Sequence, residues 1–362
     1  MRCRARALIS TAFAVVFLVL PSASSLLAAE ASVLLERSSG DVRVRAPGGK
    51  DYIKVEAGAQ IRDGARLRTD ADGSARLKYT DGSLLEIKPQ SELIVRAAQA
   101  ERPSGVVLFL GRVWAKVARS VAGETSFEVQ SANAVAGVRG TEFEVGVGLD
   151  GSARVLVSEG EVKVAGESRE ESVRDGQAIE SDQDRLGQVG KTPADPNWEG
   201  WFAERARRME KAGLKVAKAL DGRLNRRRAQ VERLIGEQKA LRQRIESLES
   251  KKKKGADVEG ELKDTLSKLE RITERLEDMK SRLEGSFGLF ERWGAIAAKG
   301  DLKDARAIGA LAGNIEKIAA DFADMIEEGT DQSPEGMEEM MDDMQKGKRD
   351  RPKDSAADEL FR

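Results

Sequence analysis

The residues that could do chemistry are few, and their types argue against catalysis. The 362-residue chain has no histidine, which is the commonest side-chain base and metal ligand near neutral pH. Its one cysteine, Cys3, lies at the N-terminus, so the folded body is expected to hold neither a disulfide nor a cysteine-based site. Acidic residues are plentiful, but none falls on a motif that pairs a nucleophile with a base. We assign no catalytic, cofactor-binding or metal-binding residue and expect no enzymatic activity.

Residues 134–145 have the pattern of a contact element. Two glycines interrupt a strand-forming run, and glycine inside a strand marks a bulge or a close backbone approach. Arg139 lies between them, where it either contacts a partner or an anion, or donates to backbone carbonyls at the kink. The candidate structural or partner-contact residues in this stretch are Gly137, Arg139, Gly140, Thr141, Glu142 and Phe143.

Trp114 is a further candidate contact residue. It alternates with Arg112 and Lys116 along an expected strand. A tryptophan in this setting serves either as a ligand platform or as a core aromatic, and an isolated strand tryptophan usually packs. Aromatic residues are only 4% of the chain, and the net charge is −1, so neither stacking platforms nor a basic excess favours nucleic acid as a partner.

These candidates require a β domain over residues 31–190 to position them. Alternating runs such as Val-Arg-Val-Arg at 42–45 and Phe-Glu-Val at 127–129 predict half-buried strands, and Asp-Gly pairs between such runs predict tight turns. The continuous apolar run at 106–110 predicts a strand that is buried on both faces. The turn spacing fits either a sandwich or a solenoid-like stack of short strands, and the sequence does not separate the two.

The order of motifs in this half resembles the FecR domain. Val-Arg-Gly-Thr-Glu-Phe at 138–143 and Val-Ser-Glu-Gly-Glu-Val at 157–162 match its signature. The segment at 63–69 is similar to the family's Gly-Asp-x-Leu-x-Thr, with Asp-Gly in place of Gly-Asp, and 79–87 resembles its Asp-Gly-Ser hairpin. The resemblance covers about residues 40–180. It implies a periplasmic domain of the kind that relays a signal from an outer-membrane receptor to a sigma factor.

The N-terminus predicts export. Arg2, Arg4 and Arg6 precede an apolar run at 7–20 and a small-residue region at 22–29, which is the layout of a secretory signal peptide over residues 1–29. An uncleaved N-terminal anchor is the alternative. FecR-like signalling proteins carry a cytoplasmic segment and a membrane span before the domain, so a signal peptide here makes direct anti-sigma activity doubtful. The mature protein is expected in the periplasm or outside the cell.

A linker at 191–196 is expected to lead into a helix that Asp195 caps. Trp198, Trp201 and Phe202 would share one face of that helix, either as an interdomain contact or as a local cluster. Two narrow leucine stripes over 197–285 predict a long helical hairpin or coiled coil, with unbroken dimeric helices as the alternative. Residues 286–329 predict a short helical bundle. The charge-rich segment 330–362 predicts a disordered tail.

Taken together, these features predict a non-enzymatic exported scaffold: an all-β FecR-like domain followed by an all-α coiled-coil or hairpin region. We expect its partner to be an envelope protein or a cell-wall component, with self-association through the coiled coil as a further expectation. No nucleic acid, no cofactor and no transmembrane helix in the mature chain are expected. A periplasmic signal-sensing protein is the alternative.

Overall fold

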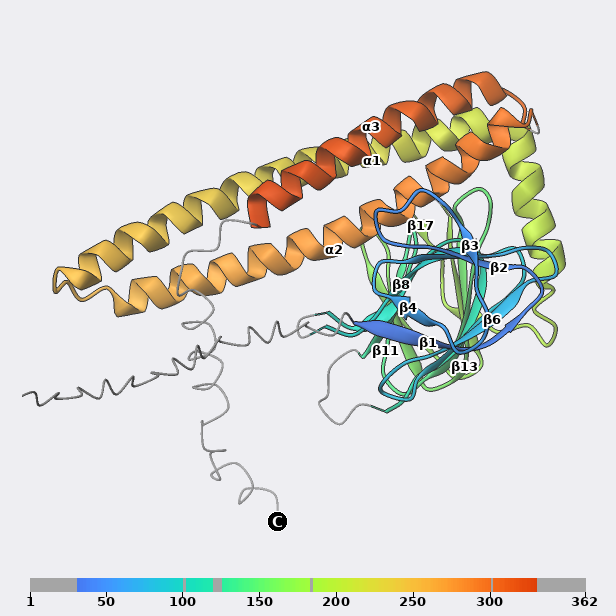
Figure 1. Ribbon diagram of the computed structural model, residues 1–362, viewed down its shortest axis with the longest axis horizontal. Coiled ribbons are helices and arrows are strands. Elements are labelled where there is room, and N and C mark those ends of the chain that lie inside the picture. The colour runs from blue at the N-terminus through green and yellow to red at the C-terminus, as the bar shows by residue number, and fades with distance from the viewer. Residues whose placement is uncertain (1–30, 100–101, 120–125, 183–184, 301, 331–362) are drawn as a thin grey trace, which may run out of the picture. The chain divides into compact units, whose positions relative to one another are not determined.

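A computed structural model describes residues 31–99, 102–119, 126–182, 185–300 and 302–330 (Figure 1). The predicted signal peptide at 1–29 and the predicted tail after Thr330 lie outside the described residues. The order of elements confirms the expected fold class, because the last described strand ends at Lys191 and all described helices follow Asn197.

The strands form two sheets that share one long strand. Sheet A contains, in spatial order, β4 (Gln60–Arg62), β1 (Ser32–Ser39), β6 (Ser74–Lys78), β7 (Leu84–Ile87), β9 (Ser104–Lys116), β12 (Glu142–Val147), β13 (Ala153–Glu159) and β16 (Gln177–Asp182), with the short β17 (Arg185–Leu186) and β18 (Gly190–Lys191) both paired to β16. Sheet B contains β3 (Ile53–Lys54), β2 (Val42–Arg45), β5 (Arg66–Thr69), β8 (Glu92–Arg96), β9, β10 (Phe127–Gln130), β11 (Val135–Val138), β14 (Glu161–Ala165) and β15 (Glu170–Arg174).

The two sheets pack face to face over a single apolar core. Strand β9 reaches both, because its first half pairs with β8 and β10 and its second half with β7 and β12. Gly111 lies at the change of sheet with φ of 100°, a backbone conformation that favours glycine. Apart from the parallel β9–β10 pair, the described pairings are antiparallel. The arrangement is therefore the sandwich rather than the solenoid of the two architectures left open by the sequence.

Three helices follow the sandwich: α1 (Trp198–Lys253), α2 (Glu259–Ala298) and α3 (Ala305–Thr330). Helices α1 and α2 form a hairpin around Gly255, and α1 bends at Ala212, whose backbone leaves the helical region (Figure 1). The N-cap of α1 is Asn197 rather than Asp195; its side chain accepts the Gly200 N–H. Helix α2 is continuous across the boundary predicted at residues 285 and 286.

The leucine stripes form the contact between the helices. Val231 and Leu234 belong to the main helical core, together with Trp293 and Phe290. A separate cluster at the hairpin tip contains Ile245, Leu248, Leu262, Leu266 and Leu269. Within the described residues, no helix combines the length and apolar character needed to span a bilayer.

Candidate partner-binding face

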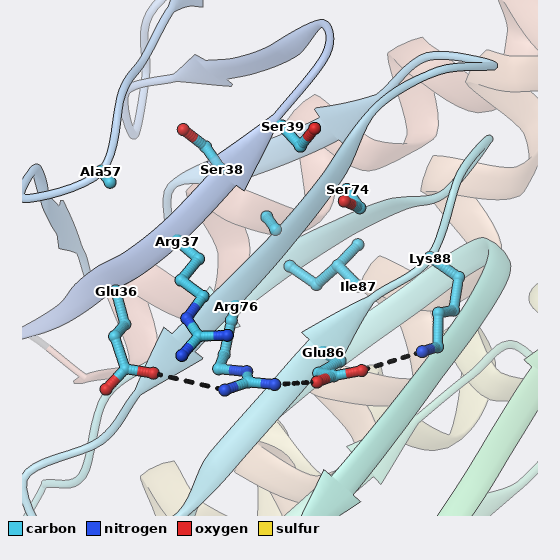
Figure 2. A pocket seen from close by; sticks show the side chains of 11 residues that line it. Glu36, Arg37, Ser38, Ser39, Ala57, Ser74, Arg76, Glu86, Ile87 and Lys88 are labelled. Carbon is cyan, nitrogen blue, oxygen red and sulfur yellow. Dashed lines mark hydrogen bonds and ion pairs between the residues drawn. The ribbon is translucent and has the colours of Figure 1, made fainter.

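The outer face of sheet A carries a row of charged side chains that alternates in sign. Figure 2 shows Arg76 between Glu36 and Glu86, with Lys88 at the end of the row. These residues come from β1, β6 and the end of β7. Lys88 Nζ lies 2.8 Å from Glu86 Oε2, and Arg76 pairs with both Glu86 and Glu36. The row borders a pocket of about 450 Å³ that Arg37 and Ser74 also line.

Glu86 is the electrostatic centre of this row. Hydrogen bonds from Lys88 and Arg76 hold the pKa of its carboxyl below the ordinary value of 4.5. The depressed pKa means that Glu86 contributes stability above pH 4.5 and that this contribution is lost as the pH falls through its folded pKa. The Glu86 carboxyl is therefore ionised at neutral pH and remains paired with Arg76 and Lys88.

Trp114 continues the row on β9. It is directly opposite Glu86 on β7 and Glu144 on β12. Its sequence neighbours Val113 and Ala115 are fully buried in the sandwich core, so strand alternation places Trp114 on the opposite, outer face, where it is half-buried. The structure thus places Trp114 outside the core, beside two carboxylates.

One carboxylate oxygen of Glu144 accepts no hydrogen bond. Its Oε2 is buried and has no hydrogen-bond partner, and it forms an ion pair with Arg112 Nη1 at 3.6 Å. Burial of a carboxylate oxygen without a hydrogen-bond donor is costly, and the charge of Arg112 offsets part of that cost. We define the charged face as Glu36, Arg76, Glu86, Lys88, Trp114 and Glu144.

The residues predicted at the kink are divided between structural and surface positions. Phe143 is fully buried in the core, and Thr141 is buried with its hydroxyl donating to the Glu161 carbonyl oxygen at 3.0 Å. Gly140 has φ of 63°, and a side chain there would overlap Arg119. Gly137 is a ladder residue of β11, paired with Glu128 and Lys163. These positions build the turn between the two sheets.

Arg139 and Glu142 are the polar kink residues nearer to solvent. Arg139 is exposed, and it has an interaction partner within the fold. Glu142 is half-buried, and its carboxylate accepts from Lys116 Nζ at 3.3 Å. Glu142 and Trp114 lie on neighbouring strands, whereas Arg139 lies beyond the end of β11. The kink and the charged face are thus adjacent features, joined through β12.

The aromatic residues at the start of α1 lie against the other half of the same sheet. Trp198 and Trp201 pack on Leu156, with Ala178 and Phe202 at the edge of the cluster. Arg112 and Arg154 lie over the Trp198 ring at 5.3 and 5.6 Å. The helix start therefore covers sheet A around β13 and β16, and the charged face lies over β1, β6, β7, β9 and β12.

The charged face was not predicted from the sequence, although most of its charged residues alternate with apolar residues along their strands. Leu-Leu-Glu-Ile-Lys at 84–88 places Glu86 and Lys88 on one face of β7. What was missing is the pairing of β7 with β6 and β9, because contacts between distant strands leave no local signal.

The strands that carry the kink and Trp114 match a known protein family. Residues 65–163 match the family described as FecR protein. The matched segment runs from β5 into β14, so it contains both the kink and Trp114. This match confirms the resemblance to the FecR domain seen in the motifs.

The other comparisons add little. No curated protein matches the chain. Two crystal structures described as a "putative anti-sigma factor" from Parabacteroides distasonis are similar, each at 18% identity with a TM-score of 0.32 and over 38% of this chain. The match spans 64% and 63% of those two chains, which is less than two thirds of their length. Among the described residues, no group of three or more Asp, Glu, His or Cys side chains is arranged to hold a metal ion.

Proposed function

We propose that this protein is a non-enzymatic scaffold of the cell envelope whose FecR-type domain binds another envelope protein through the charged face. The observation that carries the proposal is the half-buried Trp114 on the outer face of sheet A, directly opposite Glu144 on the neighbouring strand. Both belong to the segment that matches the FecR family. Export, which the arginines and apolar run at the N-terminus favour, would place this face in the periplasm or outside the cell.

The chemistry of the face selects a basic side chain on the partner. A guanidinium or ammonium group over Trp114 would gain a cation–π contact, and the carboxylates of Glu86 and Glu144 on the two neighbouring strands would attract its charge. The fixed row of alternating charges from Glu36 to Lys88 would set the register of the partner, because like charges placed in contact are unfavourable.

A periplasmic sensing or regulatory protein is the second candidate function. It is favoured by the contacts that fasten the helices to the sandwich. The Trp293 indole on α2 donates to the Leu149 carbonyl oxygen at 2.7 Å, and Glu291 on α2 pairs with Arg45 and Arg66 on sheet B. A partner that altered the sandwich would therefore act on a helix directly joined to it.

The test is a crosslinking pull-down of the epitope-tagged full-length protein from intact cells, with the mature N-terminus sequenced from the same material. We expect processing near Ala29 and recovery of an envelope protein. Trp114→Ala and Glu144→Gln should each reduce recovery of that protein at least fivefold, and Trp114→Phe should retain most of it. An intact N-terminus with a sigma-factor complex would instead favour the signalling function.

Matched controls separate contact from folding. Glu170→Gln removes a carboxylate from the edge strand β15, and Lys163→Ala changes an exposed residue on the outer face of sheet B. Both variants should recover the partner as the native protein does. Equal recovery with Glu144→Gln and Glu170→Gln, at equal thermal stability, would contradict the assignment of the charged face.

A further inference from the structure

A crevice of about 630 Å³ lies where the sandwich meets the first turns of α1 and the last turns of α2. Its sandwich side is formed by the end of β5, the turn between β7 and β8, and the bend of β9 at Gly111. Gln90 in that turn has φ of 58°, a left-handed backbone that is uncommon for a residue with a side chain. The turn is held in place because the Gln90 N–H donates to the Asp70 carbonyl oxygen at 3.1 Å.

One wall of the crevice is apolar. Leu110 and Leu149 contribute from the sandwich, and Phe202 and Ile296 contribute from the two helices. Small-molecule sites typically combine such a wall with a small number of convergent polar groups. The volume is large enough for a short acyl chain with a polar head.

The polar groups of the crevice have a surplus of unpaired positive charge. Arg68, Arg292 and Lys299 line it, and none of the three has a carboxylate at ion-pair distance in the part of the chain that the structure describes. Arg292 Nε is buried without a hydrogen-bond partner. Arg68 lies over the Tyr52 ring at 5.5 Å.

The carboxylates of the crevice do not cancel these cations. Glu92 already forms an ion pair with Arg66, whose Nη2 lies 2.6 Å from its carboxylate. It also accepts a hydrogen bond from the Tyr52 hydroxyl at 2.9 Å. Asp70 and Glu199 remain, so three cations face two carboxylates that have no ion pair. A bound carboxylate would balance the charge and supply an acceptor for Arg292, and a guanidinium fork suits a carboxylate.

We propose that this crevice binds an amphipathic monocarboxylate, with its acyl chain against Leu149, Phe202 and Ile296 and its carboxylate at Arg292 and Arg68. This site is separate from the charged face and goes beyond the proposed scaffold function. Because its walls come from both the sandwich and the helices, an occupant binds only when the two are docked. The ligand therefore stabilises the docked arrangement by mass action.

The experiment is titration of the full-length protein with octanoate, read by calorimetry and by the shift of the thermal unfolding midpoint. We expect saturable binding and a midpoint that rises with octanoate concentration. Acetate, 1-octanol and inorganic phosphate should have no such effect, since each lacks either the chain or the carboxylate. Binding of phosphate as tight as that of octanoate would overturn the amphipathic assignment in favour of a simple anion site.

Variants locate the binding. Arg292→Gln and Arg68→Gln should each weaken octanoate binding at least tenfold, and two variants are used in case one folds poorly. Arg207→Gln removes an arginine from the exposed side of α1 and should leave the affinity unchanged. Absence of octanoate binding to the native protein, or equal affinity for Arg207→Gln, Arg68→Gln and Arg292→Gln, would overturn the proposal.

Discussion

Asp150 is a carboxylate that the fold buries completely at the tip of the β12–β13 hairpin. Desolvation raises its pKa, and hydrogen bonds from Ser152 and the charges of Arg205 and Arg208 oppose that rise without cancelling it. Arg208 Nη1 lies 3.4 Å from Asp150 and 2.9 Å from Asp182, so it has a second partner.

We expect Asp150→Asn to gain stability relative to the native protein at neutral pH. The raised pKa favours the protonated form in the folded state, so the stability linked to this group is present below pH 3.8 and lost as the pH rises through the folded value. The advantage of Asp150→Asn should therefore shrink towards acid. Urea unfolding between pH 3 and pH 8 measures it, with Glu210→Gln on exposed α1 as control. A difference that does not change with pH would contradict the expectation.

Trp114 shows how far residue-level prediction reached. The sequence showed that Trp114 alternates with Arg112 and Lys116 along a strand, and in the structure these three side chains share the less buried face while Val113 and Ala115 occupy the buried one. The preference for a core position came from the general tendency of isolated strand tryptophans to pack in the core. That tendency does not indicate which face of a given strand points to the core. The position of Trp114 opposite Glu86 and Glu144 could not be predicted, because it depends on the register of β9 with β7 and β12.

At the level of elements, α2 approaches β9 closely because it has glycine where the two meet. A Cβ on Gly288 would overlap the Phe109 ring, and one on Gly285 would crowd the backbone at Ser131 and Ala132. Phe109 belongs to the apolar run expected to be buried on both faces; the core covers one side of that run, and α2 covers the other. The sequence identified the run, but not the helix that covers it.

We expect Gly288→Ala to destabilise the protein by about 1–3 kcal/mol, because the added methyl group overpacks the contact with Phe109. Gly236→Ala is the matched control on α1, where a Cβ meets nothing within 4 Å. There alanine should stabilise by up to about 1 kcal/mol through its helix propensity. Urea denaturation of both variants gives the comparison. Equal stability of the two would indicate that α2 does not lie on β9 in solution.

The whole molecule has two helical regions with different support. Near the sandwich, Trp293 and Glu291 fasten α2 to the β domain. At the hairpin tip, the five-residue apolar cluster is made by α1 and α2 alone. The heptad pattern predicted the hairpin over 197–285, because it depends only on local spacing, and the residues around Trp293 were assigned to a separate bundle over 286–329. The pattern gave no information on which part of the helices contacts the sandwich, since those contacts are with strands more than 100 residues earlier in the sequence.

We expect Leu266→Ala to loosen the tip and leave the sandwich unaffected. Removing a buried leucine side chain costs about 2–5 kcal/mol, and here the cost should fall on local opening of residues 240–270. Hydrogen exchange by mass spectrometry should show faster exchange in that segment and unchanged protection in β9 and β12. A uniform loss of protection along the chain would show instead that the helices and the sandwich unfold together.

Strand β9 has a mechanical consequence. Its ladder joins β7, β8, β10 and β12, so the strand is fixed on both sides in both sheets. A load applied through α2 reaches β9 at Phe109, close to the bend where the strand passes from one sheet to the other. Withdrawing the strand would require several ladders to break at once rather than one after another. Under load the strand is therefore expected to resist extraction until these ladders break together.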